Sequence, residues 1–182
     1  MKNLAQKDGE NNVDERSGSG GLLLQIAVVG GGNCSPEVRA QARRLGRLLA
    51  EEGHVVLCGG LGGVMEAVCC GAKEAGGLTV GILPGEKEGA NRYVGIAIAT
   101  GMGHARNVII VKSADAVIAL PGEHGTLSEI ALALKMGKPV ISLGSWDIPG
   151  TIKAEMPDEA LELLDLQVSQ RRSWGDRKDN RS

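Results

Sequence analysis

Three glycine-rich segments carry the residues of this chain that are best suited to chemistry. The first covers residues 30–35, Gly-Gly-Gly-Asn-Cys-Ser, directly after an aliphatic run. Ser35 followed by Pro36 is typical of a helix start, whose free N–H groups attract anions, and glycines let the backbone approach a ligand closely. The full dinucleotide fingerprint is absent because Ser35 occupies its sixth position. A plain turn and a phosphate site are equally acceptable here, and the candidate contacts are Gly30, Gly31, Gly32, Asn33 and Ser35.

The second segment, residues 59–66, reads Gly-Gly-Leu-Gly-Gly-Val-Met-Glu and also follows an aliphatic run. Four glycines before a helix are more than a turn requires. Met65 is placed to lie against a flat base, although a methionine at a helix start more often belongs to the core. Glu66 either contacts a ligand hydroxyl or complements the helix N-terminus. The candidate ligand contacts of this segment are Gly59, Gly60, Gly63 and Met65.

The third segment, residues 121–129, reads Pro-Gly-Glu-His-Gly-Thr-Leu-Ser-Glu. Backbone N–H groups at a helix start, together with the Thr126 hydroxyl, can cradle a phosphate, and Glu129 follows one turn later on the same face. The spacing Thr126-x-x-Glu129 is also a capping box that needs no ligand, and the pattern alone favours that interpretation. The candidate phosphate contacts are Gly122, Glu123, His124, Gly125 and Thr126.

Arg106 is a fourth candidate, early in a predicted helix and close to His104. A guanidinium group at this place can clamp a phosphate or sugar bidentately. On its own, the position is equally typical of a solvated helix charge, which is the commoner case.

These segments fall between alternating strands and helices. The sequence predicts strands over residues 22–29, 54–58, 78–83, 93–99, 115–120 and 139–143. Helices are predicted over residues 36–52, 64–76, 103–113, 125–136 and 157–166. Short connections between alternating elements indicate one Rossmann-like α/β domain with a doubly wound parallel sheet and three layers. Because ligands of such sheets lie beyond the carboxyl ends of the strands, the glycine turns should meet at one edge.

Composition narrows the function further. The chain has 182 residues, a net charge of −2, 2% aromatic residues and no Phe. This balance disfavours binding to DNA or to acidic membranes, and it disfavours a base-stacking surface for single-stranded nucleic acid.

We expect a cytoplasmic protein with reduced thiols, because the sequence contains no Cys-x-x-Cys pair, signal peptide or membrane-spanning run. No metal site is expected. Cys34, at a helix N-terminus, is taken as a structural thiol, with a reactive thiol or a soft metal ligand as the less favoured alternatives. Residues 1–21 and 167–182 are predicted to be tails flanking a domain over residues 22–166.

Taken together, the segments around residues 59–65, 101–107 and 121–129 resemble the Lonely Guy (LOG) superfamily, often mislabelled as lysine decarboxylases. The similarity extends over about residues 22–145 and is greatest to a small bacterial branch that is similar to the molybdenum-cofactor carrier protein. It implies a Rossmann-like fold and a homodimer or higher homo-oligomer. Enzymes of the family hydrolyse the N-glycosidic bond of nucleoside 5'-monophosphates and need no cofactor.

The resemblance implies roles for individual residues. Gly122, Gly125 and Thr126 would hold the phosphate, with Arg106 and Glu129 as the catalytic pair. A carboxylate can stabilise an oxocarbenium-like ribose or orient the attacking water. The chain departs from the family motif at Glu123, where a glycine is usual, and at Asn107, where a lysine is usual. We therefore keep two hypotheses: hydrolysis, slightly favoured by the Arg106 and Glu129 pair, and carriage of molybdenum cofactor or another phosphorylated pterin as cargo.

Overall fold

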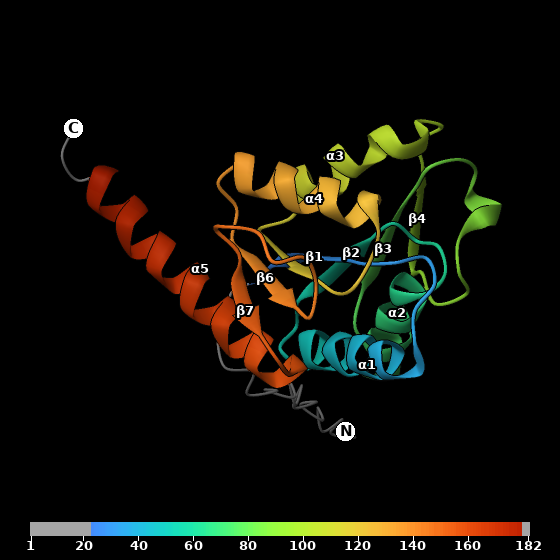
Figure 1. Ribbon diagram of the computed structural model, residues 1–182, viewed down its shortest axis with the longest axis horizontal. Helices are drawn as coiled ribbons and strands as arrows, with labels where there is room; N and C mark the ends of the chain where they lie inside the picture. The colour runs from blue at the N-terminus through green and yellow to red at the C-terminus, as the bar shows by residue number, and fades with distance from the viewer. Residues whose placement is uncertain (1–22, 180–182) are drawn as a thin grey trace, which may run out of the picture.

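A computed structural model describes residues 23–179. Seven parallel strands form one sheet between two layers of helices (Figure 1). The strands are β1 Gln25–Val29, β2 Val55–Cys58, β3 Thr79–Leu83, β4 Ile96–Ala99, β5 Ala116–Ala119, β6 Val140–Leu143 and β7 Ile152–Ala154. The helices are α1 Pro36–Glu51, α2 Val64–Glu74, α3 Asn107–Ser113, α4 His124–Lys135 and α5 Pro157–Asp179, with 3₁₀ turns η1 Lys87–Gly89 and η2 Gly103–Arg106. The predicted three-layer Rossmann-like α/β class is confirmed.

Strand order places the first strand in the middle of the sheet. The order is β4-β3-β2-β1-β5-β6-β7, so the chain builds outward from β1 to β4 and then restarts on the other side with β5. Ala27 of β1 pairs with Leu57 on one side and with Val117 on the other. The loops after β1 and β5 consequently diverge at a switch point, where open α/β sheets bind ligands.

Alternation along the strands builds two aliphatic cores. Ile26 and Val28 of β1 lie in the cluster covered by α1, α2 and α5, whereas Ala27 and Val29 lie in the cluster covered by α3 and α4. Both faces of the central strands are buried, which is why these strands read as continuous aliphatic runs. Val, Ile, Leu and Ala therefore fill both cores without the help of aromatic side chains.

Helices α1 and α2 cross in very close contact at two glycines. A β-carbon on Gly46 would lie 2.0 Å from the Val68 carbonyl oxygen, and one on Gly71 would lie 1.8 Å from the Arg43 carbonyl oxygen. Real β-carbons do not approach backbone oxygens so closely. This crossing holds α1 and α2 side by side (Figure 1), and it fixes where their N-termini sit at the sheet edge.

Several element boundaries differ from the sequence prediction. Strand β4 begins at Ile96 and not at residue 93, and the helix predicted over 103–113 is η2 followed by α3. Strand β7, only three residues long, was not predicted. Helix α5 continues to Asp179 beyond the predicted end at residue 166, so the stretch predicted as a tail is helical over 167–179. Its residues are mostly polar and carry no apolar period, although Gln, Arg and Lys favour helix. The tail predicted over residues 1–21 lies outside the described part.

None of the helices within residues 23–179 combines the length and apolar character needed to cross a bilayer.

His54, just before β2, is a buried histidine whose ionisation should make the stability of the fold depend on pH. The side chain is 7% exposed, and neither ring nitrogen has a hydrogen-bond partner. Burial lowers the pKa of His54 below 6.5, and Asp165, Glu52 and Asp115 only partly offset this effect. As the pH falls, the histidine of the unfolded chain therefore binds a proton at a higher pH than the buried His54 does. His54 consequently does not reduce the free energy of unfolding above pH 6.5, and it reduces that free energy as the pH falls from 6.5 to the lowered pKa.

We expect His54→Leu to remove that acid-side loss, because an apolar side chain of similar size leaves no unpaired polar group. Urea unfolding of both proteins well above and just below the ordinary histidine pKa measures the effect. An equal loss of stability on acidification in both proteins would exclude His54 as its source.

Candidate functional site

A cavity of about 290 Å³ opens at the switch point, between the loops that follow β1, β2 and β5. Nine residues singled out from the sequence line it: Gly30, Gly31, Gly32, Asn33, Met65, Arg106, Glu123, Gly125 and Thr126. Leu61, His104 and Asn107 complete the lining. The carboxyl edge of the sheet thus brings together segments that are about 30 to 90 residues apart in the sequence.

Backbone hydrogen bonds tie the three glycine loops to one another. The Gly31 N–H donates to the Pro121 carbonyl over 3.0 Å, and the Val64 N–H donates to the Gly31 carbonyl over 3.0 Å. Ser35 caps α1 by accepting a hydrogen bond from the Val38 N–H, and its side chain is not part of the cavity lining. Ser35 therefore positions the helix start and does not line the cavity.

Gly63 and Gly122 do not line the cavity, but both lie where two of the glycine loops pack too closely for a side chain. Gly63 has φ of +63°, and a β-carbon there would lie 2.3 Å from the Gly31 carbonyl oxygen. On Gly122 a β-carbon would lie 2.2 Å from the Thr126 hydroxyl and 2.7 Å from the Gly31 nitrogen. These two residues let the loops meet, so they shape the cavity without lining it.

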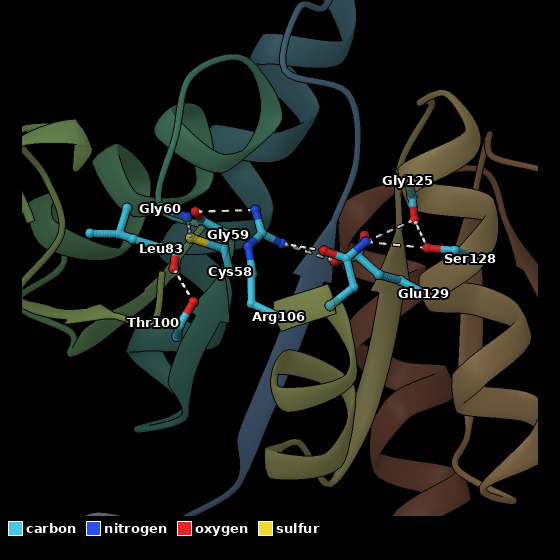
Figure 2. A network of polar contacts seen from close by, with 10 residues as sticks. Cys58, Gly59, Gly60, Leu83, Thr100, Arg106, Gly125, Ser128 and Glu129 are labelled. Atoms are coloured by element: carbon cyan, nitrogen blue, oxygen red, sulfur yellow. Dashed lines mark hydrogen bonds and ion pairs between the residues drawn. The ribbon is translucent and has the colours of Figure 1, made fainter. Parts of the chain in front are cut away.

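Arg106 occupies the centre of the site, between the loop after β2 and helix α4 (Figure 2). Its guanidinium lies 3.6 Å from a Glu129 carboxylate oxygen, and both side chains are less than 10% exposed. One terminal nitrogen also donates to the Asn107 side-chain oxygen over 2.6 Å, and the other approaches the Gly59 carbonyl at 3.5 Å. A β-carbon on Gly59 would lie 2.3 Å from that second nitrogen, so any larger residue there would displace the Arg106 side chain. The Arg106 Nε atom is buried without a hydrogen-bond partner.

Burial changes the ionisation of this pair. It raises the pKa of Glu129 from 4.5 to about 7, and the nearby Arg106 charge opposes this rise without cancelling it. The pKa of Arg106 is lowered by the same loss of hydration. Glu129 can therefore accept or release a proton near neutral pH, as a group used in acid–base chemistry must.

Helix α4 presents its N-terminus to the cavity. It begins at His124, with Glu123 as the N-cap residue and no side-chain cap hydrogen bond. Thr126 and Glu129 both lie inside the helix and are buried, so the capping-box interpretation is wrong. The N–H groups of a first helical turn lack carbonyl partners within the helix and are free for an anion. The side chains of Glu123 and His124 are exposed, and only Glu123 borders the cavity.

Two residues that sequence reasoning did not select support the site. Asn107 accepts from Arg106 and donates to the Ser128 hydroxyl over 3.2 Å, so it links the central arginine to α4. Trp146 follows β6, and its indole N–H donates to the Gly122 carbonyl over 3.0 Å. The signal for Trp146 was its rarity, because it is one of only two tryptophans and follows a predicted strand. In the sequence, Asn107 stands out only as a departure from the motif of the LOG superfamily.

Comparison with known families and proteins places these features in context. Residues 23–172 match the SLOG cluster4 family. A protein of Archaeoglobus fulgidus that is itself uncharacterised is 55% identical over 140 residues, which cover 76% of this chain and 93% of that protein. A probable cytokinin riboside 5'-monophosphate phosphoribohydrolase of Oryza sativa is 34% identical over 96 residues. That match covers 50% of this chain and 42% of the enzyme, so the chain spans less than half the length of this plant relative.

Solved structures match over a larger share of the chain. The molybdenum cofactor binding protein of Rippkaea orientalis has a TM-score of 0.77 and 42% identity, covering 81% of this chain and 98% of that one. The molybdenum cofactor carrier protein of Chlamydomonas reinhardtii has a TM-score of 0.75 and 34% identity, covering 82% and 99% respectively. Both similarities extend over about four-fifths of this chain and nearly the whole of the matched protein.

Proposed function

Because the chain belongs to the SLOG cluster4 family, we propose that its switch-point cavity binds the phosphate end of a small phosphorylated ligand. Arg106 carries this proposal. Its guanidinium is buried beside the cavity, and its Nε–H lacks a partner among the described residues, at a cost that a bound anion would offset. The N-terminal turn of α4, with Gly125 and Thr126, supplies backbone donors opposite it.

A phosphorylated pterin such as molybdenum cofactor is our first choice of ligand, carried as cargo and not used as a resident cofactor. Molybdenum-cofactor proteins match this chain over about four-fifths of its length, whereas the match to the plant hydrolase covers about half. Glu123, a carboxylate at the rim, and Asn107, a neutral amide, leave the cavity with fewer cations than the hydrolase motif supplies. The sequence alone slightly favours hydrolysis, and the larger share of the chain matched by the molybdenum-cofactor proteins is our reason for placing carriage first. Free cysteine thiols suit a reducing compartment, and we propose the cytoplasm.

Hydrolysis of a nucleoside 5'-monophosphate is the second candidate, and the Arg106–Glu129 pair favours it. Ionised Glu129 would stabilise positive charge on the ribose or orient water, while Arg106 holds the sugar phosphate. The products would be the free base and ribose 5-phosphate. A carboxyl whose pKa is near 7 suits this role, because both of its protonation states are accessible.

One experiment separates these candidates. Purified protein is incubated with AMP and other nucleoside monophosphates, free base is measured by chromatography, and binding of molybdopterin is followed by thermal shift. We expect stabilisation by molybdopterin and no release of base. Release of base from a monophosphate would favour hydrolysis over carriage, and stabilisation by none of these ligands would remove both candidates.

We also propose that the chain forms a homodimer through the apolar surface near β4. Ile96 and Ile98 pair with Val80 and Ile82, so they lie on the sheet face that α3 and α4 cover elsewhere. No helix of the described part, residues 23–179, covers them here, and they are 47% and 43% exposed. Met102 and Val108, which follow β4 in the sequence, are also exposed apolar residues, at 48% and 40%. An exposed patch of this kind is typical of an interface.

Ile98→Asp should therefore convert a dimer into a monomer, because a carboxylate buried at the interface would be unpaired. Light scattering after size-exclusion chromatography measures the mass. Met156→Asp is the matched control, since Met156 is 58% exposed and distant in sequence from the patch. A wild-type monomer, or a dimer that survives Ile98→Asp, would contradict this assignment.

A further inference from the structure

A second cavity, of about 400 Å³, lies on the outer surface between α1, α2 and the segment that leads into β4. None of its lining residues belongs to the switch-point cavity. Pro36, Ala40 and Ala67 form its apolar wall, and Tyr93, the one tyrosine of the chain, borders it. An aromatic side chain placed at a cavity in a chain almost without aromatics suggests contact with a planar ring.

Arginines dominate the polar part of this cavity. Arg39, Arg43 and Arg92 line it, against one lining carboxylate, Glu66. Arg43 is neutralised by Glu74, but Glu74 also pairs with Arg47 over 2.9 Å. Together these four arginines and two glutamates leave two positive charges in excess.

The two most available guanidinium groups belong to Arg39 and Arg92. Arg39 approaches Glu66 only to 3.8 Å, with half of its side chain exposed. Arg92 lies over the Tyr93 ring at 4.7 Å from its centre and donates to the tyrosine hydroxyl over 2.5 Å. No carboxylate partner of Arg92 occurs among the side chains of residues 23–170. A planar guanidinium group of this kind recognises phosphate bidentately.

Asn91 connects this cavity to the switch point. Its amide donates to the carbonyls of Gly60 and Leu61 over 3.1 and 2.9 Å, and its side-chain oxygen accepts from the Tyr93 N–H. The residue next to Arg92 therefore holds the glycine loop after β2. Helix α2 makes a second connection, because Met65 lines the switch-point cavity and Glu66 lines the outer one.

We propose that the outer cavity is a second binding site, for a small organic phosphate that carries a planar ring, and that its occupancy is coupled to the switch-point cavity through Asn91. Arg39 and Arg92 would bind the phosphate, and Tyr93 would contact the ring. This site is independent of the ligand and chemistry proposed above for the first cavity.

Cysteine alkylation tests the proposal, because each cavity has a half-buried thiol near it. Cys70 lines the outer cavity, whereas Cys34 follows Asn33 of the switch-point cavity. Iodoacetamide labelling of the full chain, quantified by peptide mass spectrometry, is measured with AMP, adenosine and pyrophosphate as probes. We expect AMP at about ten times its dissociation constant to slow Cys70 labelling roughly tenfold. Adenosine, which lacks a phosphate, should leave the labelling rate unchanged.

The variant Arg39→Ala/Arg92→Ala provides the control, since both side chains are exposed and absent from the first cavity. In this variant AMP should no longer protect Cys70, while any protection of Cys34 should persist. Protection of Cys70 that survives in the variant would place the ligand elsewhere and overturn the proposal. Equal protection by adenosine, or none by AMP or pyrophosphate, would overturn the assigned ligand class.

Discussion

If the chain is a hydrolase, Glu129→Gln is expected to reduce the release of free base strongly while leaving ligand affinity close to that of the wild type. If the chain is a carrier, the same substitution should change the affinity only. The substitution keeps the shape of the side chain but removes its ability to ionise. Loss of a positioned acid–base group reduces turnover by about 100- to 10,000-fold. Chromatographic measurement of base, with calorimetric titration of the same ligand, determines the two quantities separately. Glu51→Gln, at the exposed end of α1, is the matched control.

The pH dependence of the wild type gives a second view of the same residue. Because burial raises the pKa of Glu129 to about 7, a reaction that needs the carboxylate should accelerate as the pH rises through 7 and then level off. A rate that changes only near the ordinary glutamate pKa of 4.5 would show that the buried carboxyl is not the group that titrates. Undiminished base release by Glu129→Gln would exclude it from the chemistry.

Gly71→Ala should destabilise the fold more than most single substitutions. Its β-carbon would lie 1.8 Å from the Arg43 carbonyl oxygen, so α1 and α2 must move apart along their whole crossing. Overpacking of this kind costs about 3 kcal/mol, which lowers the melting temperature of a domain of this size by roughly 6–12 °C. In an exposed helix the same change would instead stabilise by about 0.5–1 kcal/mol.

Thermal and urea unfolding measure the effect. Gly89→Ala is the matched control, because a β-carbon there meets no atom within 4 Å and its backbone is ordinary. The control should unfold within about 0.5 kcal/mol of the wild type. Equal stability of Gly71→Ala and the wild type would mean that the two helices separate without loss of packing.

The sequence predicted the position of the site better than its internal contacts. Glycine turns after three parallel strands must meet at one edge, so the clustering of Gly31, Gly63 and Gly122 follows from local patterns and topology. The burial of Arg106 and Glu129 does not follow from local patterns. It depends on how α3 and α4 pack, and a solvated charge has the same sequence signature.

Other features could not be predicted because they depend on contacts between residues far apart in the sequence, or because the local hydrophobic pattern gives no sign of them. Trp146 reaches the Gly122 carbonyl because β6 lies beside β5, although 24 residues separate them. Strand β7 has three residues, too few for an alternating pattern to be recognised. The polar continuation of α5 is helical without an apolar stripe, so hydrophobic periodicity gave no reason to extend it beyond residue 166.

The central position of β1 has a consequence for the order in which the molecule can assemble. Strands β1 to β4 with α1 and α2 are neighbours in sequence and in space, so this half can form before the rest of the chain has been synthesised. The pairing of Ile26 with Ala116 closes a loop of 90 residues, and such distant contacts form late. Arg106 and Glu129 lie in the late half, while the loops after β1 and β2 lie in the early half. A nascent chain emerging from the ribosome should therefore expose the sheet face that awaits α3 and α4, and it should acquire ligand affinity only after residue 129 is free to fold.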